Sequence, residues 1–224
     1  MQRATRVLLD LDGTLVDTAP DLVGALHATC DMFGVPRLDS DAARRQVANG
    51  GLGMIQSAFA EHSLAQQQHA HAWFLEYYAN HIAEHSSVFP GLAVVLDAQP
   101  ATWGIVTNKP EYLTHLLLDA LNLTDKIGCV VAGDTLPVRK PDPAPLLFAA
   151  EQLGAEPTQF LYAGDHLRDV QAAQAAGMYA IAVGYGYNLV GDTPDAWNAD
   201  AVCSTPAALA NLIAEKTGAP QYES

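Results

Sequence analysis

Short apolar runs recur along the chain, and each ends at polar residues or at glycine. The runs are rich in Leu, Val and Ile, are of strand length, and are followed by segments of helical length. Buried strands that alternate with helices are typical of a parallel sheet, so this pattern predicts an α/β fold. The predicted strands occupy residues 5–10, 103–107, 128–132, 159–164 and 179–183.

The first two runs are separated by about 90 residues, which is too many for one crossover connection. This stretch shows helical patterns and no clear strand, so an inserted helical domain is the simplest interpretation. We expect residues 1–16 and 89–217 to form the sheet domain and residues 17–88 to form the insertion. Its helices are predicted over 20–34, 40–48, 52–62 and 65–85.

Local signals set the expected ends of these helices. Ser40 is placed as the N-cap of the second helix, because a serine side chain can accept from the free amides of the first turn. Gly50, Gly51 and Gly53 are expected to form a flexible break between the second and third helices.

Charge and composition exclude several classes of partner. The formal net charge is −14 and no segment clusters Lys and Arg, so we expect no nucleic-acid partner. No long apolar segment or leader-like segment is present, and we expect a cytoplasmic protein with no membrane partner. The three cysteines, Cys30, Cys129 and Cys203, are odd in number and widely spaced, which predicts reduced structural thiols.

Polar residues follow several predicted strands directly. In open α/β sheets, ligands bind beyond the carboxyl ends of the strands, so these residues are candidates for one shared site. Lys140 precedes a helix that should run under the same edge. The candidates at strand ends are Asp10, Asp12, Thr107, Asn108, Asp165 and Asp169.

Four carboxylates at one edge repel each other unless a cation joins them. Oxygen ligands without His or Cys suit Mg²⁺, which commonly shares its ligands with a phosphate. With that ion in place, Asp10 can attack phosphorus as a nucleophile and form an acyl phosphate. Asp12 can serve as acid and then as base, while Thr107 and Lys140 hold and neutralise the phosphoryl oxygens.

Four segments of the chain resemble, in order, the four motifs of the haloacid dehalogenase (HAD) superfamily. They are LLDLDGTLVDT at 8–18, IVTNK at 105–109, RKPDP at 139–143 and AGDHLRD at 163–169. The resemblance implies a Rossmann-like catalytic core with a helical cap inserted after the first strand. It also implies phosphate binding by Thr107, Asn108 and Lys140.

The same resemblance implies a set of metal ligands. These are Asp10, Asp165 and Asp12, the last through its backbone carbonyl, with Asp169 just outside the ligands. Many relatives carry an acid or Ser where this chain has His166, so His166 is not assigned to the metal.

The HAD fold supports several reactions, and particular residues discriminate among them. Dehalogenases lack the second aspartate, whereas Asp12 is present. The phosphonate-cleaving branch needs a cap lysine, and no lysine lies between Asp17 and Phe89. A phosphomonoester hydrolase is therefore favoured. Loss of Asp10, Lys140 or Asp165 would mark an inactive binding module, and all three are present. A sugar phosphomutase and a general small-metabolite phosphatase stay open as alternatives.

The chain further resembles the phosphoglycolate phosphatase-like group. Four segments are more similar to the N-acetylmuramic acid 6-phosphate phosphatases of bacterial cell-wall recycling: NGG at 49–51, HSSVFPG at 85–91, WGIVTNKP at 103–110 and YGYNLVGDTPDAWNAD at 185–200. Both substrates carry a carboxylate, so a cap cation is expected to face the site. Arg44 and Arg45 are the candidates for that contact, and Gly50 and Gly51 are expected to face the substrate. Cap motion about residues 16–18 and 88–91 is expected to gate turnover.

Overall fold

The computed structural model describes residues 6–98, 102–187, 191 and 193–219. Within these residues, six parallel strands form one sheet in the order β5-β4-β1-β6-β7-β8. This sheet confirms the predicted α/β fold, and its last strand is one that the sequence pattern did not predict. The strands are β1 (Arg6–Leu9), β4 (Trp103–Val106), β5 (Cys129–Val131), β6 (Phe160–Gly164), β7 (Tyr179–Val183) and β8 (Ala201–Cys203).

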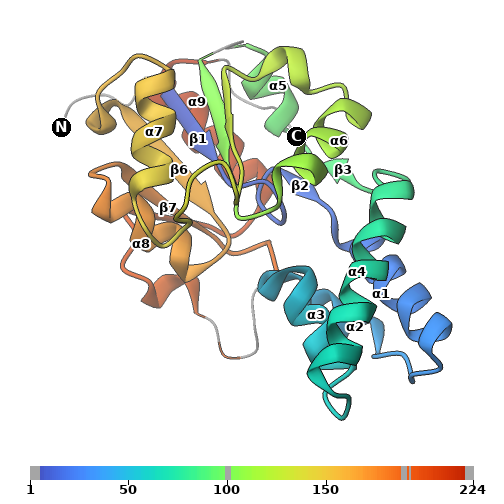
Figure 1. The fold of residues 1–224 in the computed structure, drawn as a ribbon. Coiled ribbons are helices and arrows are strands. Elements are labelled where there is room, and N and C mark those ends of the chain that lie inside the picture. The colour runs from blue at the N-terminus through green and yellow to red at the C-terminus, as the bar shows by residue number, and fades with distance from the viewer. Residues whose placement is uncertain (1–5, 99–101, 188–190, 192, 220–224) are drawn as a thin grey trace.

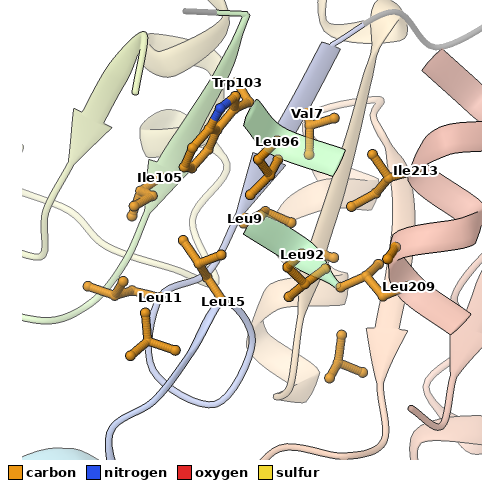
Figure 2. Close-up of a cluster of buried hydrophobic side chains, with 14 of the residues drawn as sticks. Val7, Leu9, Leu11, Leu15, Leu92, Leu96, Trp103, Ile105, Leu209 and Ile213 are labelled. Carbon is orange, nitrogen blue, oxygen red and sulfur yellow. The ribbon is translucent and has the colours of Figure 1, made fainter. Parts of the chain in front are cut away.

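The interior strand β1 shows why the sheet is covered on both faces. Val7 and Leu9 point into one buried cluster and Leu8 points into another, because successive side chains of a strand alternate between faces. Figure 2 shows the first cluster, where Leu92 and Leu209 lie against these strand residues. One face is covered by α5 (Leu92–Asp97), α6 (Glu111–Ala120) and α9 (Pro206–Thr217), and the other by α7 (Ala144–Gln152) and α8 (Leu167–Ala175).

A group of helices stands apart from the sheet, at the carboxyl ends of its strands (Figure 1). We call it the cap. It lies between β2 (Val16–Asp17) and β3 (Ser87–Val88), which pair antiparallel where the chain leaves and re-enters the sheet layer. The cap has its own buried cluster, which includes Leu26, Met54 and Phe74. Its helices are α1 (Ala19–Phe33), α2 (Ser40–Gln46), α3 (Gly50–Ala58) and α4 (Leu64–Asn80).

Short 3₁₀ helices complete the described secondary structure. The first, η1 (Val47–Asn49), joins α2 to α3 in the cap. The others are η2 (Thr124–Lys126), η3 (Pro157–Gln159) and η4 (Pro194–Ala196).

Two local predictions for the cap were wrong. The N-cap of α2 is Asp39, whose side chain accepts from the amides of Asp41 and Ala42, so Ser40 is already the first helical residue. The three glycines do not separate two helices. The chain turns at η1, and Gly50, with φ 71°, starts α3 directly. Gly51 and Gly53 continue that helix, because its packing in the cap outweighs the low helix propensity of glycine.

The cysteine prediction is confirmed: Cys30, Cys129 and Cys203 are free thiols. Among the described helices, none has both the length and the apolar character that a membrane crossing requires.

Candidate active site

Three carboxylates meet beyond the carboxyl ends of β1 and β6. Asp10 follows β1 and its amide donates to the carbonyl of Ala163, which extends the strand pairing by one residue. Asp165 follows β6, and Asp169 lies in the first turn of α8. One oxygen from each of these three carboxylates lies within 4.8 Å of the others.

Lys140 reaches into this cluster from the segment before α7. Its Nζ lies 2.9 Å from Asp10 Oδ1 and 2.7 Å from Asp169 Oδ1, and the side chain is buried. It also donates to the carbonyl of Val106 and to the Tyr162 hydroxyl, which in turn donates to Asp169. Two hydrogen bonds and two ion pairs therefore hold the ammonium in one place.

The charges of this cluster do not balance. Burial, opposed by Lys140 and reinforced by Asp169 and Asp12, raises the pKa of Asp10 to about 6. Burial and the neighbouring Asp10 and Asp169 raise the pKa of Asp165 well above its usual value. Burial alone would lower the pKa of Lys140, but its two carboxylate partners raise it.

The donor set fits a hard divalent cation. The three carboxylates lie beside one ammonium, which pairs with Asp10 and Asp169, so the cluster carries excess negative charge that a divalent cation would neutralise. All the candidate ligand atoms are oxygens, which suits Mg²⁺. The cluster also includes Asp169, which the sequence placed just outside the ligands. The predicted Asp12 ligand is its backbone carbonyl, and that assignment stays a prediction.

Asp12 faces a different set of partners. Its Oδ1 accepts from the Thr18 hydroxyl at 2.7 Å and from Lys109 Nζ at 2.9 Å. Lys109 is buried and also donates to the hydroxyl of Tyr78, which comes from cap helix α4. Burial would lower the pKa of Lys109, yet the charge of Asp12 and the hydrogen bond to Tyr78 raise it. Asp12 is therefore held by Lys109 of the sheet layer and by Thr18 at the start of the cap. Lys109 is held in turn by Tyr78 of the cap.

Tyr187 links the carboxylate cluster to the start of the cap. Its backbone amide donates to Asp165 Oδ2 at 2.7 Å. Its hydroxyl accepts from the amides of Thr18 and Ala19, at 2.6 and 2.9 Å, and donates to Asp17. The side chain of Thr18 makes no cap hydrogen bond. The Tyr187 hydroxyl instead accepts from the free amides at the N-terminus of α1.

Gly186, the neighbour of Tyr187, explains how closely this segment approaches the cluster. An added Cβ at Gly186 would lie 2.4 Å from Asp165, so a larger residue would displace that carboxylate. The segment at 185–200 that resembles the muramic acid phosphatases therefore borders the site, although its residues 188–190 and 192 lie outside the described residues.

The predicted phosphate-binding residues lie at the same edge. Thr107 is buried directly after β4, and its amide donates to the carbonyl of Val131. The Asn108 side chain pairs with the backbone of Lys140, as donor to the carbonyl at 3.1 Å and as acceptor from the amide at 3.2 Å. Asn108 therefore positions the loop that carries Lys140.

Among the described residues, no hydrogen bond or ion pair joins the predicted cap residues to the carboxylate cluster, and their contact with the substrate stays a prediction. Arg44 pairs with Asp17 at 3.1 Å and stacks over the ring of Tyr187. Arg45 is exposed in the last turn of α2. Gly50 and Gly51 begin α3, and an added Cβ at Gly51 would lie 2.8 Å from the Phe74 ring.

Sequence reasoning missed Lys109, Thr18, Tyr78 and Tyr187. Lys109 and Thr18 lie inside the two motif segments quoted at 105–109 and 8–18, so their proximity to Thr107 and Asp12 was a usable signal. Tyr78 and Tyr187 gave no local signal, because their contacts join parts of the chain that are far apart in sequence.

The chain matches a family model described as haloacid dehalogenase-like hydrolase over residues 7–183. It is 40% identical over 206 residues to a phosphoglycolate phosphatase of Xanthomonas campestris, covering 91% of this chain and 93% of the relative. It is 36% identical over 215 residues to an N-acetylmuramic acid 6-phosphate phosphatase of Pseudomonas putida, covering 94% and 96%.

Among solved structures, the fold is similar to that of a predicted phosphoglycolate phosphatase from Haemophilus somnus. The TM-score is 0.84 at 25% identity, and the match covers 95% of this chain and 99% of the other. With a family model that matches most of the chain and relatives that cover nearly all of it, this chain belongs to the haloacid dehalogenase-like hydrolase family.

Proposed function

We propose that this protein is a Mg²⁺-dependent phosphatase that hydrolyses small phosphate monoesters through an aspartyl phosphate on Asp10. The main support is the separation of its two motif aspartates. Asp10 lies with Lys140 in the carboxylate cluster, and Asp12 lies apart from it with Lys109 and Thr18. A nucleophile and an acid with separate environments are what this reaction needs.

In the first step, a carboxylate oxygen of Asp10 attacks phosphorus, and the bond between phosphorus and the leaving oxygen breaks. Asp12 donates a proton to that oxygen, so the alcohol leaves neutral. In the second step, Asp12 takes a proton from a water that attacks the acyl phosphate. Inorganic phosphate is released and the Asp10 carboxylate is restored.

Charge stabilisation comes from the residues around Asp10. Lys140 is fixed by two hydrogen bonds and two ion pairs and can neutralise a phosphoryl oxygen without reorganising, and Thr107 adds a hydroxyl at the same edge. Mg²⁺, held by Asp10, Asp165 and the Asp12 carbonyl, with Asp169 beside them, would supply the remaining positive charge that phosphoryl transfer requires.

The substrate is proposed to be phosphoglycolate or N-acetylmuramic acid 6-phosphate. The support is that similar relatives, which cover nearly the whole chain, carry these two names. A sugar phosphomutase would need to keep water from the acyl phosphate, and no contact among the described residues favours that alternative.

We further propose that residues 17–88 move as a cap domain against a core of residues 1–16 and 89–217. The paired strands β2 and β3 are the crossing points, and Tyr78 and Tyr187 join the two parts beside the reactive aspartates. Opening and closing there would control the access of water to the acyl phosphate.

The test is steady-state release of phosphate with Mg²⁺ from 2-phosphoglycolate, N-acetylmuramic acid 6-phosphate, glucose 6-phosphate and p-nitrophenyl phosphate. We expect a preference of about a hundredfold in kcat/KM for one of the two acids, which corresponds to about 2.7 kcal/mol. Asp10→Asn should abolish release from every substrate. Wild-type activity in that variant would refute the mechanism.

A further inference from the structure

Thr18, at the start of the cap, uses its side chain in an unusual way. It is the N-cap of α1, and an N-cap threonine usually accepts a hydrogen bond from the N2 or N3 amide of its own helix. Here the side chain makes no such bond. Its hydroxyl instead donates to Asp12 Oδ1 at 2.7 Å. The Thr18 hydroxyl therefore contacts the proposed acid rather than the helix that follows it.

Tyr187 provides the cap that the Thr18 side chain does not. Its phenol oxygen accepts from the backbone amides of Thr18 and Ala19, at 2.6 and 2.9 Å, and its proton goes to Asp17 Oδ1 at 2.8 Å. The next residue of the helix, Pro20, has no amide hydrogen. The first two amides of this segment are thus satisfied by a residue 169 positions further along the chain.

The phenol also determines where the Thr18 hydroxyl proton goes. Because two amides already donate to the Tyr187 oxygen, it is a poor acceptor for the Thr18 hydroxyl, whose oxygen lies 3.5 Å away. The Thr18 proton is then directed to Asp12. Without the phenol hydroxyl, the Thr18 side chain would turn to the unsatisfied amides of α1, where N-cap threonines usually bond. Asp12 would keep only its contact with Lys109.

The backbone of Tyr187 is fixed against the carboxylate cluster. Its amide donates to Asp165 Oδ2 at 2.7 Å, and at Gly186 a Cβ would lie 2.4 Å from the same side chain. The ring of Tyr187 is only 3% exposed and packs in the buried cluster of the cap. The Arg44 guanidinium lies 5.1 Å from the ring centre. The position of the phenol is therefore set by the cluster on one side and by the cap on the other.

We propose that Tyr187 is a positioning residue for the acid Asp12: its hydroxyl caps α1 and thereby keeps the Thr18 hydroxyl on Asp12. This inference rests on the proposed phosphatase function, in which Asp12 protonates the leaving oxygen. Tyr187 acts through Thr18 and not on the reacting atoms. Its loss should therefore slow those esters whose leaving group must be protonated.

The test compares Tyr187→Phe with wild type, and Tyr185→Phe is the matched control. Each variant removes one phenol hydroxyl from the same segment, and that of Tyr185 donates to the carbonyl of Thr14 at 2.8 Å. Tyr187→Phe keeps the backbone amide that bonds to Asp165. Two esters are used with Mg²⁺. One is whichever of 2-phosphoglycolate, N-acetylmuramic acid 6-phosphate and glucose 6-phosphate wild type prefers, and the other is p-nitrophenyl phosphate, whose phenolate needs no proton.

We expect Tyr187→Phe to lower kcat/KM about tenfold on the preferred alkyl ester and less than about threefold on p-nitrophenyl phosphate. The reason is that kcat/KM includes the departure of the leaving group, and only the alkyl ester depends on the acid for it. Tyr185→Phe should change kcat/KM on both esters by the same factor. Thermal unfolding establishes that both variants are folded.

A double variant tests the route through Thr18. Thr18→Val removes the hydroxyl that donates to Asp12 and should show the same dependence on the leaving group. If Tyr187 acts through that hydroxyl, adding Tyr187→Phe to Thr18→Val should lower kcat/KM on the alkyl ester by less than a further factor of about two. Losses that multiply in full would overturn the proposal.

Equal losses on both esters in a folded Tyr187→Phe protein would also overturn it, and would make Tyr187 a purely structural link between α1 and the sheet layer. So would the same leaving-group dependence in Tyr185→Phe. If Tyr187→Phe does not fold, Asp17→Ala removes the acceptor that orients the phenol hydroxyl. It should show the same leaving-group dependence to a smaller extent, and an unchanged ratio between the esters would refute the proposal. Failure of wild type to release phosphate from any ester would instead refute the proposed function, and this inference with it.

Discussion

The two motif aspartates lie only two residues apart, yet they belong to different parts of the molecule. The partners of Asp10 are Lys140 and the neighbouring carboxylates, all from the sheet layer. Asp12 is held by Lys109, which also binds Tyr78 of the cap, and by Thr18 at the start of the cap.

This difference indicates a division of labour. The proposed nucleophile, Asp10, lies with Asp165, Asp169 and Lys140 in what we call the nucleophile half, and these contacts all lie within the sheet layer. The proposed acid, Asp12, lies with Lys109, Thr18 and Tyr78 in what we call the acid half, which includes residues of both the sheet layer and the cap. Cap movement should therefore change the position of Asp12 more than that of Asp10. The two buried lysines, Lys140 and Lys109, allow each half to be perturbed separately.

The largest effect is expected when the nucleophile half loses its cation. Lys140→Met leaves Asp10 and Asp169 buried without the ammonium that bridges them. We expect kcat/KM to fall by about a thousandfold or more on every phosphate ester, because a fixed charge at the phosphoryl oxygens is removed. Phosphate release from p-nitrophenyl phosphate and an alkyl phosphate measures the loss.

The matched control is Lys126→Met. Lys126 pairs with Asp97 on the surface, where both side chains are over 40% exposed, and such pairs contribute less than about 1 kcal/mol. Its activity should be that of wild type. If Lys140→Met kept activity within about tenfold of wild type, Lys140 would not belong to the phosphoryl site.

The next largest effect is a pH dependence of stability, caused by the excess negative charge around Asp10. Without metal, the pKa of Asp10 is raised from 3.8 to about 6 in the folded protein, so the folded state holds the proton more tightly. The free energy of unfolding should therefore fall as pH rises from about 4 to about 6, by at most about 3 kcal/mol from this group. Urea unfolding in EDTA across this range measures it.

Two comparisons test whether Asp10 causes this fall in the free energy of unfolding with pH. Asp10→Asn has no such proton to lose and should show a smaller fall in stability over the same pH range. Mg²⁺ should restore stability increasingly as pH rises, because the ion replaces the proton in the cluster. Equal pH slopes for wild type and Asp10→Asn would contradict the charge assignment.

The nucleophile half was predictable from the sequence for a physical reason. Parallel strands end at one edge, so residues that directly follow Leu9 and Gly164 must lie close together whatever else the chain does. The order of strand ends therefore predicts that Asp10, Asp165 and Thr107 lie near each other.

The acid half and the cap could not be obtained in the same way. Which face of α4 presents Tyr78 to Lys109 depends on packing between parts that are distant in sequence. The predicted helix break at the glycines was wrong for a related reason. Gly50 and Gly51 have low helix propensity, but α3 packs in the cap, where a Cβ at position 51 would lie 2.8 Å from the Phe74 ring.

The smallest effect is expected from the lysine of the acid half, and it depends on the leaving group. Lys109→Met leaves Asp12 with Thr18 as its partner, so a proton donor is misplaced. We expect kcat/KM to fall by about 30-fold on N-acetylglucosamine 6-phosphate, whose alkoxide needs a proton, and less than about fivefold on p-nitrophenyl phosphate. Tyr78→Phe keeps the pair of Lys109 with Asp12 and should lose only a few-fold. A misplaced acid alone should not slow the departure of p-nitrophenolate, because this leaving group needs no proton. Equal losses of kcat/KM on both esters would therefore contradict the separation of the two halves.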